Sequence, residues 1–339
     1  MCLRIYIRFL PSYIIIAIDK NCFTKQDAIA LIIANSIPLP YFALKYHQDD
    51  FSGLFGVSSV QVFFLLILII YAYVLVLFLN KKIKIKYMIF CIVITFILLG
   101  LGEIKIGFAL IPIVSIIEVV LQKFSIKNIF LIVIGMSIMS IVGLNILIKV
   151  SPDFKDFFQL NQIKYNATKY VMKTNNPAFE LGRVENIIYT NEYILYDVEK
   201  KLYGLGVGSS MPSENWYYEY KGQQMFRKNV YTPYETDMYK QYGYSFGYQF
   251  SSMNIIYMEN GIIGFIIFYM IIFIIIKRSF VIIRKCNNIN HKCIANSMIG
   301  FMLCWIPLNF YYAYLIDRNA MYICIILSAI VTNIYSRIK

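Results

Sequence analysis

The chain has 339 residues, of which 59% are hydrophobic and only 15% are charged. Soluble domains carry roughly 25% charged residues, so the composition excludes an ordinary soluble domain and indicates an all-α, polytopic helical membrane protein. The net charge of +13 does not indicate a nucleic-acid partner, because residues 151–250 are balanced with 11 basic and 11 acidic residues. The basic excess lies in short connectors between apolar segments, which is typical of cytoplasmic loops.

Residues 1–149 predict an N-terminal bundle of five or six spans. Residues 3–18 form either a short span or an interfacial helix, and further spans are expected at 28–46, 60–79 and 128–148. The apolar run 87–121 would measure roughly 52 Å as one helix, too long for a hydrocarbon core of ~30 Å. We therefore expect two short crossings, joined by an outward turn at Gly102–Ile106.

We expect residues 150–250 to form one large external domain. This segment holds 15 of the 29 tyrosines of the chain, and tyrosine suits both stacking on sugars and the membrane interface. Ser151-Pro152-Asp153 has the pattern of a helix start. An amphipathic helix is expected over Ala178–Tyr203, ending at the glycines of "GLGVG", and loops are expected from Trp216 to Tyr248. Residues 251–339 predict a C-terminal bundle of three spans at 253–276, 299–315 and 321–335, with an inside connector at 277–296, which brings the total to eight or nine spans.

Four charged residues are candidates for chemistry. Lys105 is either a phosphate-binding cation positioned by Glu103 or half of a surface charge pair. Arg183 suits bidentate phosphate recognition, but by composition alone a salt bridge on its own helix is the more ordinary role. Glu259 lies about two turns or roughly 10 Å into its span. It is either functional, as a general base or the partner of a cation, or a buried packing contact, the latter slightly favoured.

Three further features leave alternatives open. Gly204, Gly206 and Gly208 either expose backbone N–H groups to an anion or simply stop a helix. Asp49-Asp50 either ligates a divalent metal or opens a turn. Trp216 and Tyr217 offer aromatic faces for sugar stacking.

The order of short motifs resembles the O-antigen polymerase (Wzy-type) and O-antigen ligase superfamily of bacterial surface-polysaccharide enzymes. The motifs are "DDFSGLFG" at 49–56, "GLGEIKIGF" at 100–108, "GRVENIIY…LYGLGVGSS" at 182–210 and "MENGIIGFIIF" at 258–268. Ligases carry a histidine nine residues before the glutamate of the last motif, and this chain has Phe250 there. That departure favours a polymerase over a ligase.

The resemblance implies a metal-independent glycosyltransferase without cofactors. A glycan on undecaprenyl pyrophosphate would pass to the terminal sugar of another lipid-linked repeat unit, at the outer face of the bacterial cytoplasmic membrane. Expected partners are the lipid-linked oligosaccharide, membrane lipids, a chain-length regulator and a flippase. Lys105 and Arg183 would contact the pyrophosphate, joined by Arg227 and Lys228. Trp216 and Tyr217 would contact sugar. The sequence does not identify the general base, for which Glu103 and Glu259 are the candidates.

Three other functions remain open at this point: an O-antigen ligase, a metal-dependent glycosyltransferase using Asp49-Asp50, and a flippase or other lipid-glycan transporter. Transporters usually show repeated halves and short loops, whereas this chain concentrates about 100 residues in one loop.

Overall fold

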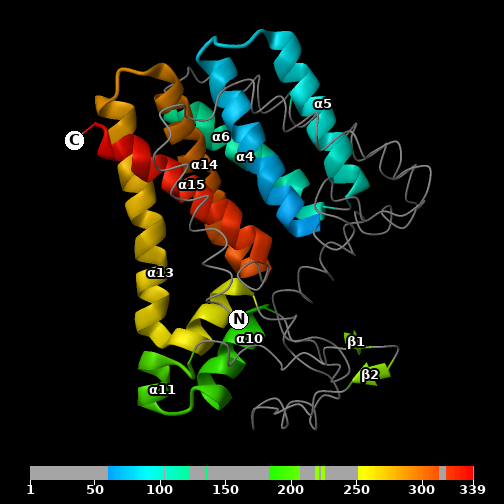
Figure 1. The fold of residues 1–339 in the computed structure, drawn as a ribbon, viewed down its shortest axis with the longest axis vertical. Coiled ribbons are helices and arrows are strands. Elements are labelled where there is room, and N and C mark those ends of the chain that lie inside the picture. Colours follow the sequence, from blue (N-terminus) through cyan, green and yellow to red (C-terminus); the bar gives the residue numbers. More distant parts are fainter. Residues whose placement is uncertain are drawn as a thin grey trace. The chain divides into compact units, whose positions relative to one another are not determined.

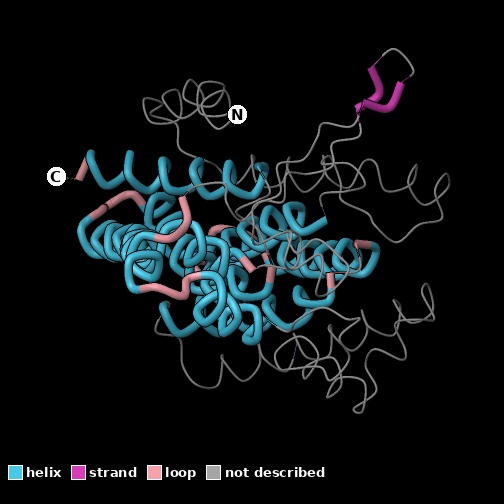
Figure 2. Tube along the Cα trace, turned by 90° about the horizontal axis from the view of Figure 1, so that it is seen from below, coloured by secondary structure: helices cyan, strands magenta, loops and turns pink. Residues whose placement is uncertain are grey.

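A computed structural model describes residues 60–102, 104–122, 135, 183–206, 218–220, 223–225, 251–312 and 318–338. This part of the chain is predominantly helical (Figure 1). Within it the only strands are β1 (Tyr218–Tyr220) and β2 (Gln223–Met225), an antiparallel pair (Figure 2) that the sequence did not lead us to expect. The chain divides into two compact units.

Unit 1 comprises residues 1–157, 272–306 and 317–339. Its centre is α4 (Val60–Leu79), which packs against α5 (Ile85–Leu101), α6 (Lys105–Leu121) and α15 (Arg318–Ser336). The helix α4 is apolar all round and almost wholly buried, as expected for the core helix of a membrane bundle. Its bounds are the predicted ones.

The run 87–121 forms two helices, as the length argument predicted. The helix α5 ends at Leu101, and α6 begins at Lys105. The intervening turn is closed by bonds from the Gly102 and Ile104 N–H groups to the carbonyls of Leu98 and Leu99, each 3.0 Å long. The break therefore falls where the sequence predicted, although α6 takes in the last two residues of the expected turn.

Two long helices extend beyond the predicted spans at their facing ends. The helix α13 covers Ser252–Lys285 and α14 covers Ile289–Tyr311, so α13 ends later and α14 begins earlier than predicted. The connector expected at 277–296 is therefore mostly helical, since only residues 286–288 separate the two helices, and its position on the inner side stays a prediction. Lysine and arginine are good helix formers, so the helices continue beyond their apolar segments.

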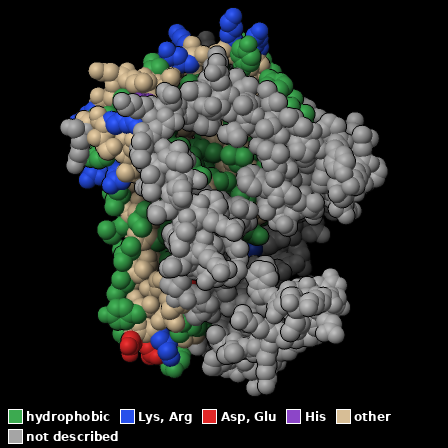
Figure 3. All heavy atoms as spheres, in the orientation of Figure 1, with side chains coloured by type: hydrophobic (Ala, Val, Ile, Leu, Met, Phe, Trp, Pro, Cys, Tyr) green, Lys and Arg blue, Asp and Glu red, His purple; other side chains and the backbone are tan. Residues whose placement is uncertain are grey.

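Among the described residues, three helices are long and apolar enough to cross a membrane, namely α4, α13 and α14, while α5, α6 and α15 are shorter apolar helices. The apolar part of α13 is mostly exposed, with Ile266, Met270 and Phe273 each at least half accessible (Figure 3). An exposed apolar helix of this length fits contact with lipid. The predicted spans at 3–18, 28–46 and 128–148 lie outside the described residues or reach them only at Gly135.

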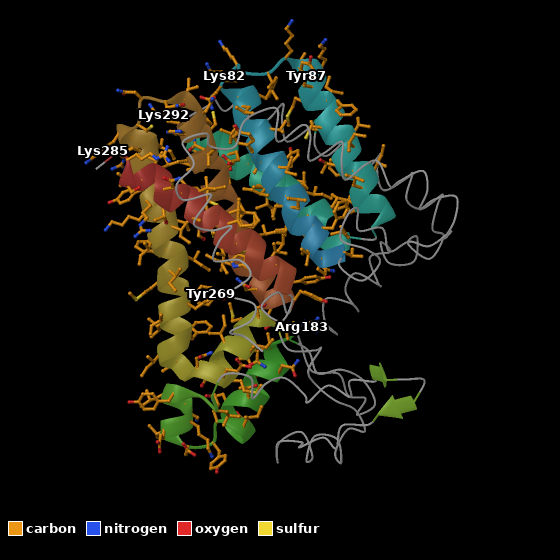
Figure 4. All side chains as sticks on the ribbon, in the orientation of Figure 1. Lys82, Tyr87, Arg183, Tyr269, Lys285 and Lys292 are labelled. Carbon is orange, nitrogen blue, oxygen red and sulfur yellow. The ribbon has the colours of Figure 1, made fainter. Side chains whose placement is uncertain are left out.

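Basic residues gather at one end of unit 1, where Lys82, Lys285 and Lys292 all lie (Figure 4). They come from the connector after α4, the end of α13 and the start of α14. Such clustering fits the cytoplasmic end of a membrane bundle.

Candidate functional site

Unit 2 comprises residues 158–271 and 307–316 and holds two of the four candidate catalytic residues, Arg183 and Glu259. Its described core consists of α10 (Arg183–Tyr189), the π-helical segment η2 (Thr190–Ile194), α11 (Val198–Tyr203), the first part of α13 and the last turn of α14. The single amphipathic helix expected over 178–203 is thus replaced by three short elements.

The C-terminal end of α14 is capped by side chains from two other elements. Arg183 donates from Nε to the Tyr311 carbonyl at 3.1 Å, and Ser252 donates from both N and Oγ to the Tyr312 carbonyl at 3.1 Å. The last carbonyls of a helix have no partner within it and carry partial negative charge, so an arginine there is stabilising. Arg183 therefore has an anchored, half-buried position rather than a loose surface one.

A row of buried polar side chains lies between α10 and the start of α13. Asn254 donates from Nδ2 to the Asn186 carbonyl at 3.4 Å, and both side chains are at most 1% exposed. One turn further along each element, Tyr257 donates from its hydroxyl to Asn191 Oδ1 at 2.8 Å. Asn191 belongs to η2, in which the Leu195 N–H donates a hydrogen bond to the Thr190 carbonyl, five residues earlier. This spacing is that of a π-helix. Such π-helical segments are frequent at functional sites.

The buried hydroxyl of Thr190 and the buried carbonyl oxygen Oδ1 of Asn254 have no hydrogen-bond partner among the described residues. Buried polar atoms are normally satisfied, so the row has room for further hydrogen bonds. The sequence carried a signal for it, because Asn186 and Thr190 are four residues apart and so share one helical face; we did not identify it as a site.

An open groove of about 380 Å³ lies beside this row. It is lined by residues of α10, η2 and α13: Ile187, Ile188, Asn191, Glu192, Met253, Tyr257, Ile262 and Phe265. The residues that line the groove are mostly apolar, and the hydrogen-bonded pair Tyr257–Asn191 adds polar groups to its wall. A surface of this mixed character can bind a molecule that is itself part polar and part apolar.

Glu259 lies on the side of α13 where two glycine-dependent segments meet. The Leu205 and Gly206 N–H groups donate to the carbonyls of Met258 and Glu259, each at 2.9 Å. A Cβ on Gly204 would clash with the Glu259 backbone, and a Cβ on Gly261 would clash with the Leu202 backbone. Each glycine thus makes room for the backbone of the other segment.

This contact corrects two expectations. The N–H groups of Leu205 and Gly206 are used by α13 carbonyls, so they are not an anion-binding nest. The helix α13 also breaks at Gly261, whose φ of 61° and ψ of −168° are not helical. Glu259 therefore lies half-buried in a short helical piece before the long apolar one, and not in a single continuous helix.

The loop between η2 and α11 ends in a charged cap on α11. The carboxylate of Asp197 accepts a bond from the Lys200 backbone N–H at 2.7 Å and forms an ion pair with Lys200 Nζ at 3.0 Å. These contacts with Lys200 lower the pKa of the Asp197 carboxyl. The Lys200 ammonium also lies 3.7 Å from the centre of the exposed Tyr196 ring, and Tyr196 and Asp197 together raise the pKa of Lys200.

The remaining candidates are placed in part or not at all. Lys105 is the first residue of α6 in unit 1, and its side chain lies outside the description. Five others lie outside the described residues: Glu103, Trp216, Tyr217, Arg227 and Lys228. The convergence of Lys105 and Arg183 on one cavity stays a prediction, because the two belong to different units.

Among the described residues no group of three or more histidine, cysteine or acidic side chains is arranged to hold a metal ion. Asp49 and Asp50, the residues on which the metal-dependent alternative depends, lie outside the described part. No family model, no curated protein and no solved structure matches the chain.

Proposed function

We propose that the chain is a polysaccharide polymerase of the bacterial cytoplasmic membrane. It would transfer a glycan from undecaprenyl pyrophosphate to the terminal sugar of another lipid-linked repeat unit, with the loop 150–250 on the outer side. The observation that carries the proposal is the meeting, within unit 2, of the Arg183 helix, the glycine loop after α11 and the Glu259-Asn260-Gly261 segment. These are two of the motifs whose order supports the resemblance to the polymerase and ligase superfamily.

The transfer needs one new bond and one broken bond. The oxygen of the acceptor hydroxyl bonds to the anomeric carbon of the donor, and the bond from that carbon to the pyrophosphate oxygen breaks. Undecaprenyl pyrophosphate leaves with the electron pair, and the hydroxyl proton passes to a carboxylate. Because negative charge grows on the leaving group, a fixed cation beside it lowers the barrier.

Arg183 supports this role because its guanidinium is held at the end of α14 before any substrate arrives. Its bond to the Tyr311 carbonyl fixes the side chain, and a preorganised donor costs no reorganisation during the reaction. Lys105, Arg227 and Lys228 are proposed as further pyrophosphate contacts. Glu259 and Glu103 are the candidates for the base, and Trp216 and Tyr217 for sugar stacking.

Deletion of the gene in its native host, followed by glycan analysis, tests the proposal. Loss of long chains with retention of single-repeat product is the expected result. Polymer that accumulates on lipid without attachment to the surface would instead indicate a ligase. If the deletion strain fails to move single repeat units outward, the chain is a flippase. In a separate experiment on the wild type, loss of polymerisation on addition of a metal chelator would indicate the metal-dependent transferase.

The role of Arg183 is separated from its structural bond by a matched pair of variants. Arg183→Ala removes the cation and a bond to α14, whereas Ser252→Ala removes the bond from Oγ to the adjacent Tyr312 carbonyl and no charge. We expect Arg183→Ala to abolish long chains at normal expression and Ser252→Ala to retain them. Equal effects of the two variants would assign Arg183 to helix capping alone, and Lys105→Ala is tested in the same way.

A further inference from the structure

Glu118 is a carboxyl group in the core of unit 1 that the proposed transfer does not use. It lies on α6, one turn before the helix ends at Leu121, and its side chain is 0% exposed. Ser115 precedes it by three residues and therefore lies on the same helical face. The Ser115 hydroxyl, also buried, is 2.7 Å from the Tyr71 hydroxyl of α4.

The opposite wall of this site is α14. Oε1 of Glu118 lies against Gly300, where a Cβ on that glycine would clash with it. The thiols of Cys293 and Cys304 on the same helix lie within electrostatic range of the carboxyl, as does the Tyr71 hydroxyl. Small side chains on α14 thus leave a space that the carboxyl fills.

The backbone of Gly300 lies close enough to interact with the Glu118 carboxyl, but neither oxygen has a hydrogen-bond partner of good geometry among the described residues. No described lysine or arginine forms an ion pair with it. Gln122, which follows the last residue of α6, is four residues from Glu118, and its Nε2 also lacks a partner within the described part. An isolated carboxylate in an apolar interior costs many kcal/mol, so such a group takes up a proton or a cation.

We propose that Glu118 is a proton-binding site, a carboxylic acid enclosed by α4, α6 and α14 that exchanges its proton at the end of the bundle where Lys82 lies. Two observations define that end. Glu118 is about 5 Å, one helical turn, from the end of α6, and Lys82 lies within electrostatic range of Cys293, a neighbour of Glu118. Among the described residues, the titratable groups that interact electrostatically with Glu118 are Tyr71 from α4 and Cys293 and Cys304 from α14.

Hydrophobic carbodiimides test this site directly. The O–H of a protonated carboxyl adds across the carbodiimide, and the adduct rearranges to a stable N-acylurea, whereas a carboxylate in water reacts poorly with such an apolar reagent. Membranes containing the full chain are treated with dicyclohexylcarbodiimide from acidic to alkaline pH, and the peptides are identified by mass spectrometry. We expect the Glu118 peptide to gain the mass of one reagent molecule, with less labelling as the pH rises.

The matched variants are Glu118→Gln, which keeps the side-chain size, and Asp197→Asn, which alters an exposed carboxylate of α11. We expect labelling at residue 118 to be lost in Glu118→Gln and to be unchanged in Asp197→Asn. An unlabelled Glu118 peptide in the folded wild type, or labelling independent of pH, would overturn the proposal. If sodium ions at constant pH protected Glu118 from labelling by the carbodiimide, this would also overturn the proposal and would indicate that the site binds a metal cation.

Infrared spectroscopy of the same membranes gives a readout that does not depend on reagent access. A protonated carboxyl in an apolar site has a C=O stretching band distinct from that of a carboxylate. We expect this band in the wild type and its loss in Glu118→Gln. Identical spectra in the two proteins would contradict the assignment.

Discussion

At the scale of single residues, two glycines decide whether the loop after α11 can reach α13. Gly204, with φ of 75° and ψ of −168°, and Gly261, with φ of 61° and ψ of −168°, occupy a backbone region that is essentially closed to other residues. Each also faces the backbone of the other segment without room for a Cβ. Conformation and close approach thus both require glycine at these two positions.

We expect Gly204→Ala and Gly261→Ala to lower the free energy of unfolding by more than the conformational strain alone, which is about 1–3 kcal/mol. Gly206→Ala is the matched control, because Gly206 has a φ of 98° but nothing within 4 Å of its added Cβ. Thermal unfolding in detergent measures all three variants. A loss in Gly204→Ala no larger than that in Gly206→Ala would show that the close contact with Glu259 is unimportant.

At the scale of elements, η2 turns Asn191 toward α13. A π-helical segment carries one more residue per turn than an α-helix, so it shifts the face on which the following side chains lie. Asn191 thereby meets the Tyr257 hydroxyl. The sequence could not show this, because a helix with one extra residue still has apolar residues at nearly helical spacing.

The Tyr257–Asn191 bond provides a test of how η2 is held on α13. Tyr257→Phe and Asn191→Ala each remove the bond, and the double variant should cost less than the sum of the two. We expect a coupling free energy of about 0.5–1.5 kcal/mol, the usual range for a neutral hydrogen bond, measured by chemical unfolding in micelles. Full additivity would contradict a direct interaction in solution.

The sequence predicted those parts of the fold that depend on apolar length. It placed α4 at its observed bounds and divided 87–121 in two, because the cost of exposing or over-extending an apolar helix in a membrane is large. It missed the helical continuation across 277–296, since membrane crossing limits the apolar segment and not the helix. It also missed the break at Gly261, because one glycine in an apolar run does not predict positive φ.

The candidate site was predictable only in part. Arg183 and Glu259 were chosen as candidates because charged residues are few and stand out in this chain. Asn186, Asn191 and Asn254 were missed because asparagine is common in external loops, and its burial depends on which helix packs against it. Tertiary contacts of this kind leave no local pattern in the sequence.

At the scale of the whole molecule, the basic connectors predict which end of the protein faces the cytoplasm. Lys81 and Asn287 lie exposed in the connectors after α4 and α13, and Tyr203 is exposed at the end of α11. We expect single cysteines at 81 and 287, introduced into a chain without other cysteines, to react with an impermeant maleimide only after permeabilisation. A cysteine at 203 should react in intact cells, and labelling of all three from outside would contradict the predicted topology.

The backbone contact between the glycine loop and α13 has a consequence for biogenesis. Its two hydrogen bonds join residues about fifty positions apart in the chain, so the loop has nothing to dock on until the ribosome has made the first part of α13. The Arg183 cap on α14 forms later still, because Tyr311 follows by more than a hundred residues. Unit 2 is therefore completed only after α14 has been made, and a chain truncated before α14 lacks the bond that holds Arg183.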